Sequence, residues 1–329
     1  MKLKVALIIS YSGKNYSGLQ HNSTGNTIED YILKVLTKLK YITAMNAAEP
    51  QKTGLQRCCR TDKGVHAIMN VLVIKVLKEV NIEEVNRELK ESVVLLKVVR
   101  VSKSFVAKNR CDRRVYEYFI PKDVFFNEDS NKDSNLNKDS NINKDSNLNK
   151  DTNIEKDENL EISNNLEKFN NFIKNYVGTK NFHNFTTRSF EKGKTRNIIE
   201  IKTISHKNFI IFRIKGQSFM LHQIRKMVGL ALLVIRKNFD ALKVLNKVFS
   251  EEVFNVPKAP SQFLLLERPE FDYYNSKNVD KAIDVCEDVI EERRGVIYGE
   301  VEEEVKEGHF KAWFDTIDEH FYDFEHFYN

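Results

Sequence analysis

One carboxylate in the chain stands between two cations where an apolar run begins. Asp62 lies in the segment RCCRTDKGVHA, with Arg60 before it and Lys63 after it. A carboxylate presented on a turn could act as a nucleophile, a general base or a metal ligand. An ordinary turn aspartate beside Gly64, with solvated basic neighbours, would have the same sequence. The segment alone therefore leaves these interpretations open.

Arg225 is the second candidate, because it lies inside the apolar run FMLHQIRKMVGLALLV. A charge in such a helix is costly unless it is paired. At helical spacing His222, Arg225 and Gly229 would share one face. We expect Asp62 to be the partner of Arg225. The alternative is that Arg225 extends to the surface, as we expect of Lys226.

A strand rich in tyrosine and arginine is the third candidate. Tyr116 and Tyr118 in RRVYEYFI would face the same side of that strand, where one could stack on a base and the other pack in the core. Just before them come Lys108, Arg110 and Arg114. Cations interleaved with aromatic rings are typical of nucleic-acid binding, although a solvated charge run has a similar composition.

The charge distribution also suggests a polyanionic partner. The net charge is +5, but residues 287–329 hold 14 acidic and 4 basic residues, a net of −10, which leaves +15 on the rest. A strongly basic body favours nucleic acid, and a lysine-rich solvated surface is the alternative. The chain has no phosphate-binding loop, dinucleotide fingerprint, zinc-protease motif or serine-hydrolase elbow in a usable context, which argues against those enzyme classes.

The cysteines and the apolar runs narrow the class further. Adjacent Cys58 and Cys59 should point to opposite sides of a strand, so we expect core thiols of a reduced intracellular protein and no metal knuckle. No apolar run has membrane-spanning length. The short apolar run after Met1 is read as a first strand and not as a secretion or mitochondrial leader.

The candidate residues must be positioned by both strands and helices. We expect strands over residues 3–9, 54–59, 67–76, 92–101, 113–120, 196–205 and 208–216, and helices over 28–40, 81–90, 163–177, 218–237 and 239–250. Strands and helices in this order predict an α+β fold in which helices flank a central antiparallel sheet.

A hexapeptide repeat divides the chain. NKDSNL and its variants recur from Asn131 to Leu160. One aliphatic residue in six buries too little surface to offset the entropy of ordering. We therefore expect an N-terminal half over residues 1–126, a disordered insertion over 127–165, a C-terminal half over 166–275 and an acidic helical extension over 276–329.

Taken together, the motifs resemble the TruA family of pseudouridine synthases, most closely its eukaryotic nuclear branch. The resemblance rests on YSGKNYSGLQ, TIED, RCCRTDKGVHA, KNRCDRRVYEY, GTKNFHNFT, KGQSFMLHQIRKMVGL, VPKAP and LLLERPEFDYYN, which occur in the family's order. They span nearly the whole chain except the repeat and the acidic tail. The resemblance implies two ferredoxin-like halves with the active-site cleft between them.

The resemblance also implies roles for the candidates. Asp62 matches the catalytic aspartate of RTDxGVxA, a nucleophile that acts on the ribose or on the ring of the target uridine. Tyr116 matches the tyrosine that stacks on the base or removes the C5 proton, and Arg225 matches the basic residue paired with the aspartate. Arg60, Lys63, Lys108, Arg110, Arg114 and His222 become candidates for RNA contact. The isomerisation needs no cofactor, and no metal is expected.

One departure from the family pattern follows VPKAP. Ser261, Gln262 and Phe263 replace a stretch that usually contains glycines, and Phe263 would narrow that wall or shift substrate choice.

The expected function is an isomerase that forms pseudouridine in tRNA, in the anticodon stem-loop region. The alternatives are a non-catalytic tRNA-binding chaperone and a sister specificity for neighbouring anticodon-loop uridines. Small nuclear RNA and mRNA are further candidate substrates. We expect a monomer without membrane association, in the nucleus or alternatively the cytoplasm.

Overall fold

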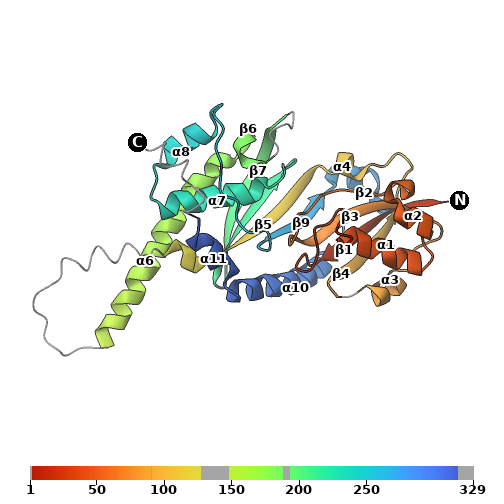
Figure 1. The fold of residues 1–329 in the computed structure, drawn as a ribbon, viewed down its shortest axis with the longest axis horizontal. Coiled ribbons are helices and arrows are strands. Elements are labelled where there is room, and N and C mark those ends of the chain that lie inside the picture. Colours follow the sequence, from red (N-terminus) through yellow and green to blue (C-terminus); the bar gives the residue numbers. More distant parts are fainter. Residues whose placement is uncertain (1, 90, 127–147, 188–192, 318–329) are drawn as a thin grey trace, which may run out of the picture. The chain divides into compact units, whose positions relative to one another are not determined.

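The computed structural model describes residues 2–89, 91–126, 148–187 and 193–317 (Figure 1). The chain forms two compact units. The first comprises Met1–Tyr118, Arg213–Ser218 and Pro260–Glu307, and the second comprises Phe119–Phe212, Phe219–Ala259 and Gly308–Asn329. These units differ from the predicted domains, because residues 260–307 belong with the N-terminal segment.

The first unit contains most of a large, mostly antiparallel sheet. Its strands are β1 (Leu3–Tyr11), β2 (Gln56–Arg57), β3 (His66–Val76), β4 (Val93–Arg100), β5 (Arg113–Pro121) and β9 (Leu264–Glu270). They follow the order β4-β1-β3-β9-β5, and β2 pairs with β3 beside this path. The pairing of β3 with β9 is parallel, through His66 and Ala67, and it departs from the all-antiparallel expectation.

Helices complete the first unit. They are α1 (Ile28–Lys38), α2 (Ala44–Ala48), α3 (Ile82–Glu88), α4 (Ala107–Arg110), α9 (Asp272–Lys277) and α10 (Glu287–Lys306), with 3₁₀ turns at Pro50–Thr53 and Val279–Lys281. The predicted start of α1 is confirmed: Thr27 accepts a hydrogen bond from the Asp30 backbone, and the Asp30 side chain accepts one from the Thr27 backbone. Such a capping box satisfies amide groups that otherwise lack partners at the helix start.

Helix α10 lies on one face of this sheet and is held by buried charges. Glu117 of β5 and Glu267 of β9 both accept hydrogen bonds from Arg294, with distances of 3.0–3.2 Å. The Tyr298 hydroxyl donates to Glu117 at 2.7 Å, and Arg213 donates to Glu267 at 2.7 Å. Side chains alternate along a strand, so Tyr116 and Tyr118 point to the face away from Glu117.

The second unit pairs three strands with helices. It contains β6 (Gly178–Asn181), β7 (Thr195–His206), part of β8 (Phe209–Gly216), α6 (Leu148–Ile173), α7 (Gln223–Arg236), α8 (Ala241–Val248) and α11 (His309–Asp315), with 3₁₀ turns at Lys122–Phe125, Lys174–Tyr176 and His183–Phe185. Its three strands follow the order β8-β7-β6. The predicted hairpin of β7 and β8 turns at Lys207, whose φ is 49°.

Two helices of this unit differ from the prediction. Helix α6 begins at Leu148 and not at Ser163, so it includes residues 148–165 of the segment expected to be disordered. The rest of that segment, 127–147, lies outside the described residues. Helix α7 begins at Gln223, five residues later than predicted, because His222 has a left-handed φ of 64°. His222 therefore precedes the helix and does not share a helical face with Arg225.

The core of the second unit is aromatic. Tyr176, Phe182 and Phe185 are fully buried. They pack on one another and on Phe249 with ring centroids 5.4–6.4 Å apart, mostly edge to face. Edge-to-face pairs add stabilisation beyond the buried area.

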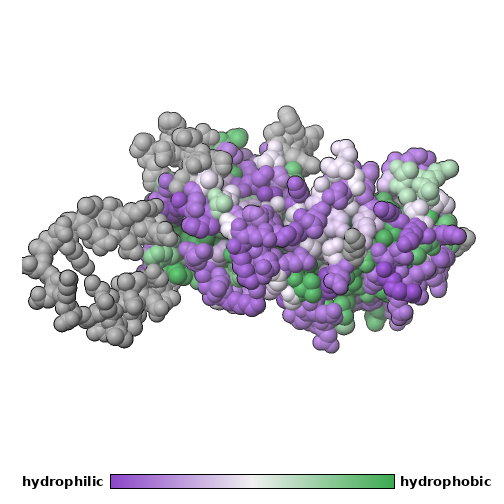
Figure 2. Space-filling model, turned by 60° about the horizontal axis from the view of Figure 1, so that its bottom comes forward, coloured by the Kyte–Doolittle hydropathy of each residue, from purple (hydrophilic) through white to green (hydrophobic). Residues whose placement is uncertain are grey.

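On the face drawn in Figure 2, hydrophilic residues predominate and hydrophobic areas lie between them. Among the described residues, no helix combines the length and the apolar character needed to cross a membrane.

Candidate active site

Asp62 lies on a tight turn between β2 and β3. The amide of Val65 donates to the Asp62 carbonyl at 3.2 Å, and Gly64 has a φ of 81°. A positive φ at the third position of a turn favours glycine, so the predicted role of Gly64 as a turn residue is confirmed. The Asp62 side chain is half-exposed, whereas Arg60 and Lys63 are exposed.

The backbone of residues 13–19 supports this turn from one side. Leu19 donates its amide to the Thr61 carbonyl at 3.1 Å. Gly18 has a φ of 96°, and a Cβ built there would lie 3.0 Å from the Thr61 carbonyl oxygen and 3.3 Å from the Asp62 carbonyl carbon. The Thr61 hydroxyl bonds to the buried Tyr11 hydroxyl at 2.7 Å. Glycine at position 18 thus permits the close approach that holds Asp62 in place.

His66 anchors the other side of the turn. Its Nε2 donates to the Gln262 carbonyl at 3.1 Å, and its Nδ1 accepts from the Gly13 amide at 3.3 Å. Burial lowers the pKa of His66 to about 4, so the ring is neutral near pH 7. Gln262 belongs to the stretch that departs from the family pattern. Its neighbour Phe263 is fully buried.

Strand β9 brings Tyr116 near the Asp62 turn. Tyr116 pairs with Leu266 of β9, and Leu266 pairs with Ala67 of β3. Two strand spacings, or about 10 Å between Cα atoms, therefore separate Tyr116 from the strand that begins just after Asp62. The ladder shifts register between Val115 and Tyr116, a bulge of the kind often found beside active sites.

The two tyrosines of β5 differ in their surroundings. Tyr118 is fully buried and donates its hydroxyl to the Pro260 carbonyl at 2.9 Å, so it packs as predicted. Tyr116 is 8% exposed. Burial, and then the charge of Cys59, raise the pKa of Tyr116 well above its ordinary value. Its phenol is therefore protonated at neutral pH.

Arg225 lies in the second unit, in the first turns of α7. It is buried, and its Nε donates to the Ala259 carbonyl at 2.6 Å while the Ala259 amide donates to the Arg225 carbonyl at 3.2 Å. Gly229 lets the same segment approach, because a Cβ there would lie 2.4 Å from the Pro257 carbonyl oxygen. These contacts fix the direction of the Arg225 side chain.

The position of Lys226 differs from the expectation that its side chain extends to the surface. It does not extend into solvent but is 5% exposed, and its Nζ donates to the carbonyls of Asn184 and Thr186 at 3.3 and 3.5 Å. Burial, and then the charge of Lys258, lower the pKa of Lys226 to about 8.

The remaining candidates for RNA contact are of two kinds. Lys108 and Arg110 are exposed on α4, and His222 is half-exposed, with its Nδ1 3.3 Å from the Thr187 hydroxyl. Arg114 is buried, and its guanidinium donates to the carbonyls of Cys111, Gln217 and Lys108. These bonds favour a structural role for Arg114.

Sequence reasoning was wrong about the adjacent cysteines. Cys58 and Cys59 do not point apart, since β2 ends at Arg57 and the two Sγ atoms lie 3.8 Å apart in the interior. Interactions with Cys111 and Cys58, and then the guanidinium of Arg114, hold the pKa of the Cys59 thiol well below its ordinary value. Cys58 and Cys59 lie just before the Asp62 turn in sequence.

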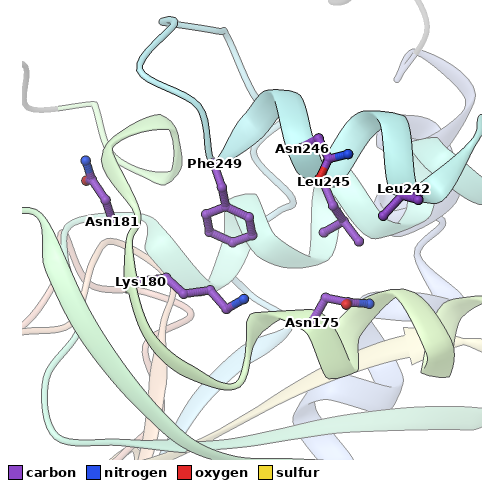
Figure 3. Close-up of a pocket in the computed structure, with 7 residues that line it drawn as sticks. All are labelled: Asn175, Lys180, Asn181, Leu242, Leu245, Asn246 and Phe249. Carbon is purple, nitrogen blue, oxygen red and sulfur yellow. The ribbon is translucent and has the colours of Figure 1, made fainter.

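A surface pocket of about 430 Å³ lies in the second unit (Figure 3). We name it the Phe249 pocket, and its lining residues are Asn175, Lys180, Asn181, Leu242, Leu245, Asn246 and Phe249. It contains none of the predicted catalytic residues.

Comparisons with known proteins show the family to which the chain is related. A family model described as tRNA pseudouridine synthase matches residues 172–272, which include Arg225 but neither Asp62 nor Tyr116. The tRNA pseudouridine synthase 1 of Yarrowia lipolytica is 32% identical over 96% of this chain and 74% of its own length. The tRNA pseudouridine(27/28) synthase of Saccharomyces cerevisiae is 32% identical over 82% of this chain and 85% of its own length. The chain belongs to the TruA family of tRNA pseudouridine synthases.

The mouse pseudouridylate synthase 1 homolog is 35% identical over 84% of this chain. The chain spans about three fifths of the length of this relative and of its human counterpart, at 62% and 61%. Within this TruA-family chain, sequence reasoning missed His66 and Ala259 as residues that hold the candidate site. A polar residue at the start of a buried strand was the available signal for His66. Ala259 offered none, because it acts through its backbone.

Proposed function

We propose that the protein isomerises uridine to pseudouridine in tRNA, with Asp62 as the nucleophile. The observation that carries this proposal is the Asp62 turn. A half-exposed carboxylate is held by backbone contacts from residues 13–19 and by the His66 anchor, in a chain of the TruA family. Rigid support of this kind favours a group that must meet a substrate atom in a defined geometry.

The reaction needs little beyond positioning. The bond between N1 of the uracil and C1′ of the ribose breaks, the ring turns, and a bond from C5 to C1′ forms while the C5 proton is lost and N1 gains a proton. Arg225, directed by Ala259, would pair with Asp62 and orient it. Extruding the target uridine from its stack costs a few kcal/mol, which cationic and aromatic groups at the site would offset.

Tyr116 would stack on the target base. Its raised pKa disfavours a phenolate in the free protein, so removal of the C5 proton by Tyr116 would require the bound substrate to change its surroundings. Tyr116→Phe separates the two roles. Stacking predicts that pseudouridine formation is largely retained, and proton removal predicts loss of the final step with accumulation of a covalent intermediate.

The strand orders support two ferredoxin-like halves. The series β1-α1-β2-β3-α3-β4 has the order β4-β1-β3-β2, and the series β5-α6-β7-β8-α7-β9 has the order β9-β5-β8-β7. Both follow the split β-α-β pattern. We propose that the cleft between these halves receives the uridine, as in the family.

The proposed substrate is the anticodon stem-loop region of tRNA. The Saccharomyces cerevisiae relative, whose name carries the label 27/28, is consistent with it. Small nuclear RNA and mRNA are further substrates to compare, and a monomer in the nucleus is the state implied by the resemblance. Sedimentation and a fluorescent fusion would test the last two points.

The decisive experiment measures tritium release from tRNA labelled at uridine C5. We expect release by the wild-type protein and none by Asp62→Ala, while binding of tRNA is retained. Asp284→Ala is the matched control, because Asp284 is an exposed acid in the same unit that pairs with Lys97 at 3.2 Å. A tRNA chaperone would release no tritium in any form, and full activity in Asp62→Ala would refute the mechanism.

A further inference from the structure

The Phe249 pocket combines three kinds of group in one place. In Figure 3 the ring of Phe249 and the side chains of Leu245 and Leu242 face Lys180 and Asn175 across the opening. None of the seven lining residues carries a negative charge. An aromatic ring, carboxamides and a cation together fit a nucleobase and its phosphate.

We propose that the Phe249 pocket binds one unpaired nucleotide of the RNA substrate, apart from the uridine that reacts. This inference rests on the proposed function for the identity of the RNA. A cavity of about 430 Å³ lies in the range of small-ligand pockets and can admit a single nucleotide but no helical segment.

The carboxamides offer groups of both hydrogen-bonding types. The Asn175 Nδ2 donates to the carbonyls of Asn171 and Phe172 at 2.9 and 3.2 Å, so its Oδ1 is the atom left to accept. The Asn181 Oδ1 accepts from the His183 amide at 3.2 Å, so its Nδ2 is the atom left to donate. Asn246 is exposed on α8 and can do both. Base edges carry matching donors and acceptors.

Phe249 and Lys180 supply the other two contacts. Phe249 is half-buried at the edge of the aromatic core, so its ring is held firmly while part of it faces the pocket. Lys180 Nζ lies 5.1 Å from the centre of that ring. A long, flexible cation in this position can move to a phosphate and expose the ring for stacking.

The pocket is a poor site for a free nucleotide. Lys180 is the one cation of the lining, and the pocket is open to solvent. Sites for free nucleoside phosphates add a glycine-rich loop or a helix N-terminus that surrounds the phosphate with backbone amides. A nucleotide within an RNA needs less from this pocket, since the rest of the RNA supplies most of the affinity.

The test compares tRNA binding and turnover in three full-length variants. Lys180→Met keeps the apolar stem over Phe249 and removes the charge, and Asn246→Ala removes an exposed carboxamide. Lys202→Met is the matched control, because Lys202 is exposed in the same unit, lies outside the pocket and pairs with Glu200 at 2.7 Å. We expect the first two to raise Kd and KM for tRNA about 3- to 10-fold with kcat unchanged.

Wild-type Kd in both pocket variants would overturn the inference, and so would an equal loss in Lys202→Met. Phe249→Leu should weaken tRNA binding about 10-fold or more, since loss of a stacking ring costs more than loss of one hydrogen bond. Its circular dichroism and melting temperature would show whether the aromatic core is intact. The two surface variants carry the test if that core is lost.

A photocrosslink identifies the occupant. A benzophenone side chain introduced as Leu242→p-benzoylphenylalanine would stand at the exposed rim of the pocket. We expect it to crosslink tRNA at one unpaired nucleotide and to give a weaker crosslink in Lys180→Met at tRNA concentrations below the wild-type Kd. Crosslinks spread over many nucleotides would overturn the proposal. Micromolar binding of free uridine monophosphate, abolished by Lys180→Met, would assign the pocket to a free nucleotide instead.

The outcomes separate this inference from the proposed function. If the wild-type protein forms no pseudouridine but the pocket variants still weaken tRNA binding, the proposed activity fails and the nucleotide site stands. If pseudouridine forms with unchanged KM in the pocket variants, the activity stands and the nucleotide site fails.

Discussion

The interiors of the two units are stabilised in different ways. In the first, α10 is fixed to the sheet by charges: the half-buried Arg294 and Arg213 meet the buried Glu117 and Glu267. In the second, the rings of Tyr176, Phe182 and Phe185 are fully buried and pack on one another and on Phe249. Ion pairs determine which groups meet and in which orientation. Aromatic rings contribute mainly through the apolar area that they bury and through how their shapes fit.

This difference bears on the candidate site. The Asp62 turn and Tyr116 belong to the charged unit, where Glu117 lies between Tyr116 and Tyr118 on β5. Burial, and then the neighbouring Glu267, raise the pKa of Glu117, while Arg213 lowers that of Glu267 in spite of its burial. The strand that presents Tyr116 therefore depends on an intact ionic network, and the stability of this unit should depend on pH more than that of the second.

The largest effect on stability should come from removing Arg294, which bonds to both glutamates of the ionic network. Arg294→Met takes one of two shared arginines from the buried Glu117 and Glu267 and leaves them with Arg213, so we expect the free energy of unfolding to fall by about 3 kcal/mol in urea titrations. Adding Glu117→Gln should recover part of the loss. Lys306→Met on the same helix removes an exposed charge and should change stability by less than about 0.5 kcal/mol. Equal effects of Arg294→Met and Lys306→Met would show that the network contributes nothing.

His66 should make the first unit sensitive to acid. Its pKa is about 4 in the folded protein against 6.5 when exposed, so the folded state binds fewer protons between these values. The stabilisation is complete above pH 6.5 and is lost as the pH falls towards 4, by up to about 3 kcal/mol. Glu300, Glu304 and Lys14 face the same region. His66→Gln should flatten this pH dependence, measured as the difference between the two unfolding curves. Parallel curves would contradict the assignment.

The smallest effect should come from the aromatic core. Tyr176 donates its hydroxyl to the Met227 carbonyl at 3.0 Å, and burial raises its pKa well above the ordinary value. Tyr176→Phe should therefore cost about 1 kcal/mol, independently of pH between 5 and 9 and of salt. A clear dependence on either would mean that charge contributes to the second unit as well.

Local signals in the sequence predicted much of the first unit. The apolar runs of β1 and β3, the cap at Thr27 and the glycine turn after Asp62 depend on neighbouring residues, so the sequence shows them directly. The start of α7 was missed because the apolar pattern continues through Met220 and Leu221 although His222 breaks the helix.

Contacts between distant segments could not be predicted in the same way. The cluster of Cys58, Cys59 and Cys111 and the bond from Arg225 to Ala259 depend on the placement of whole strands. The buried position of Lys226 depends on two carbonyls about 40 residues away in sequence. Spacing along the chain contains no record of such contacts, because the tertiary structure decides which polar groups find partners.

The position of β9 has a consequence for synthesis of the protein. This strand lies between β3 and β5, yet almost 200 residues of chain separate β3 from it, and α10 comes later still. Until residues 264–270 have been translated, β5 lacks its neighbour β9. The carboxylate of Glu117 has no contact with Arg294 until α10 has been translated as well. The N-terminal half therefore emerges from the ribosome before all strands of its sheet are present. A nascent chain of this kind would depend on chaperones until α10 emerges.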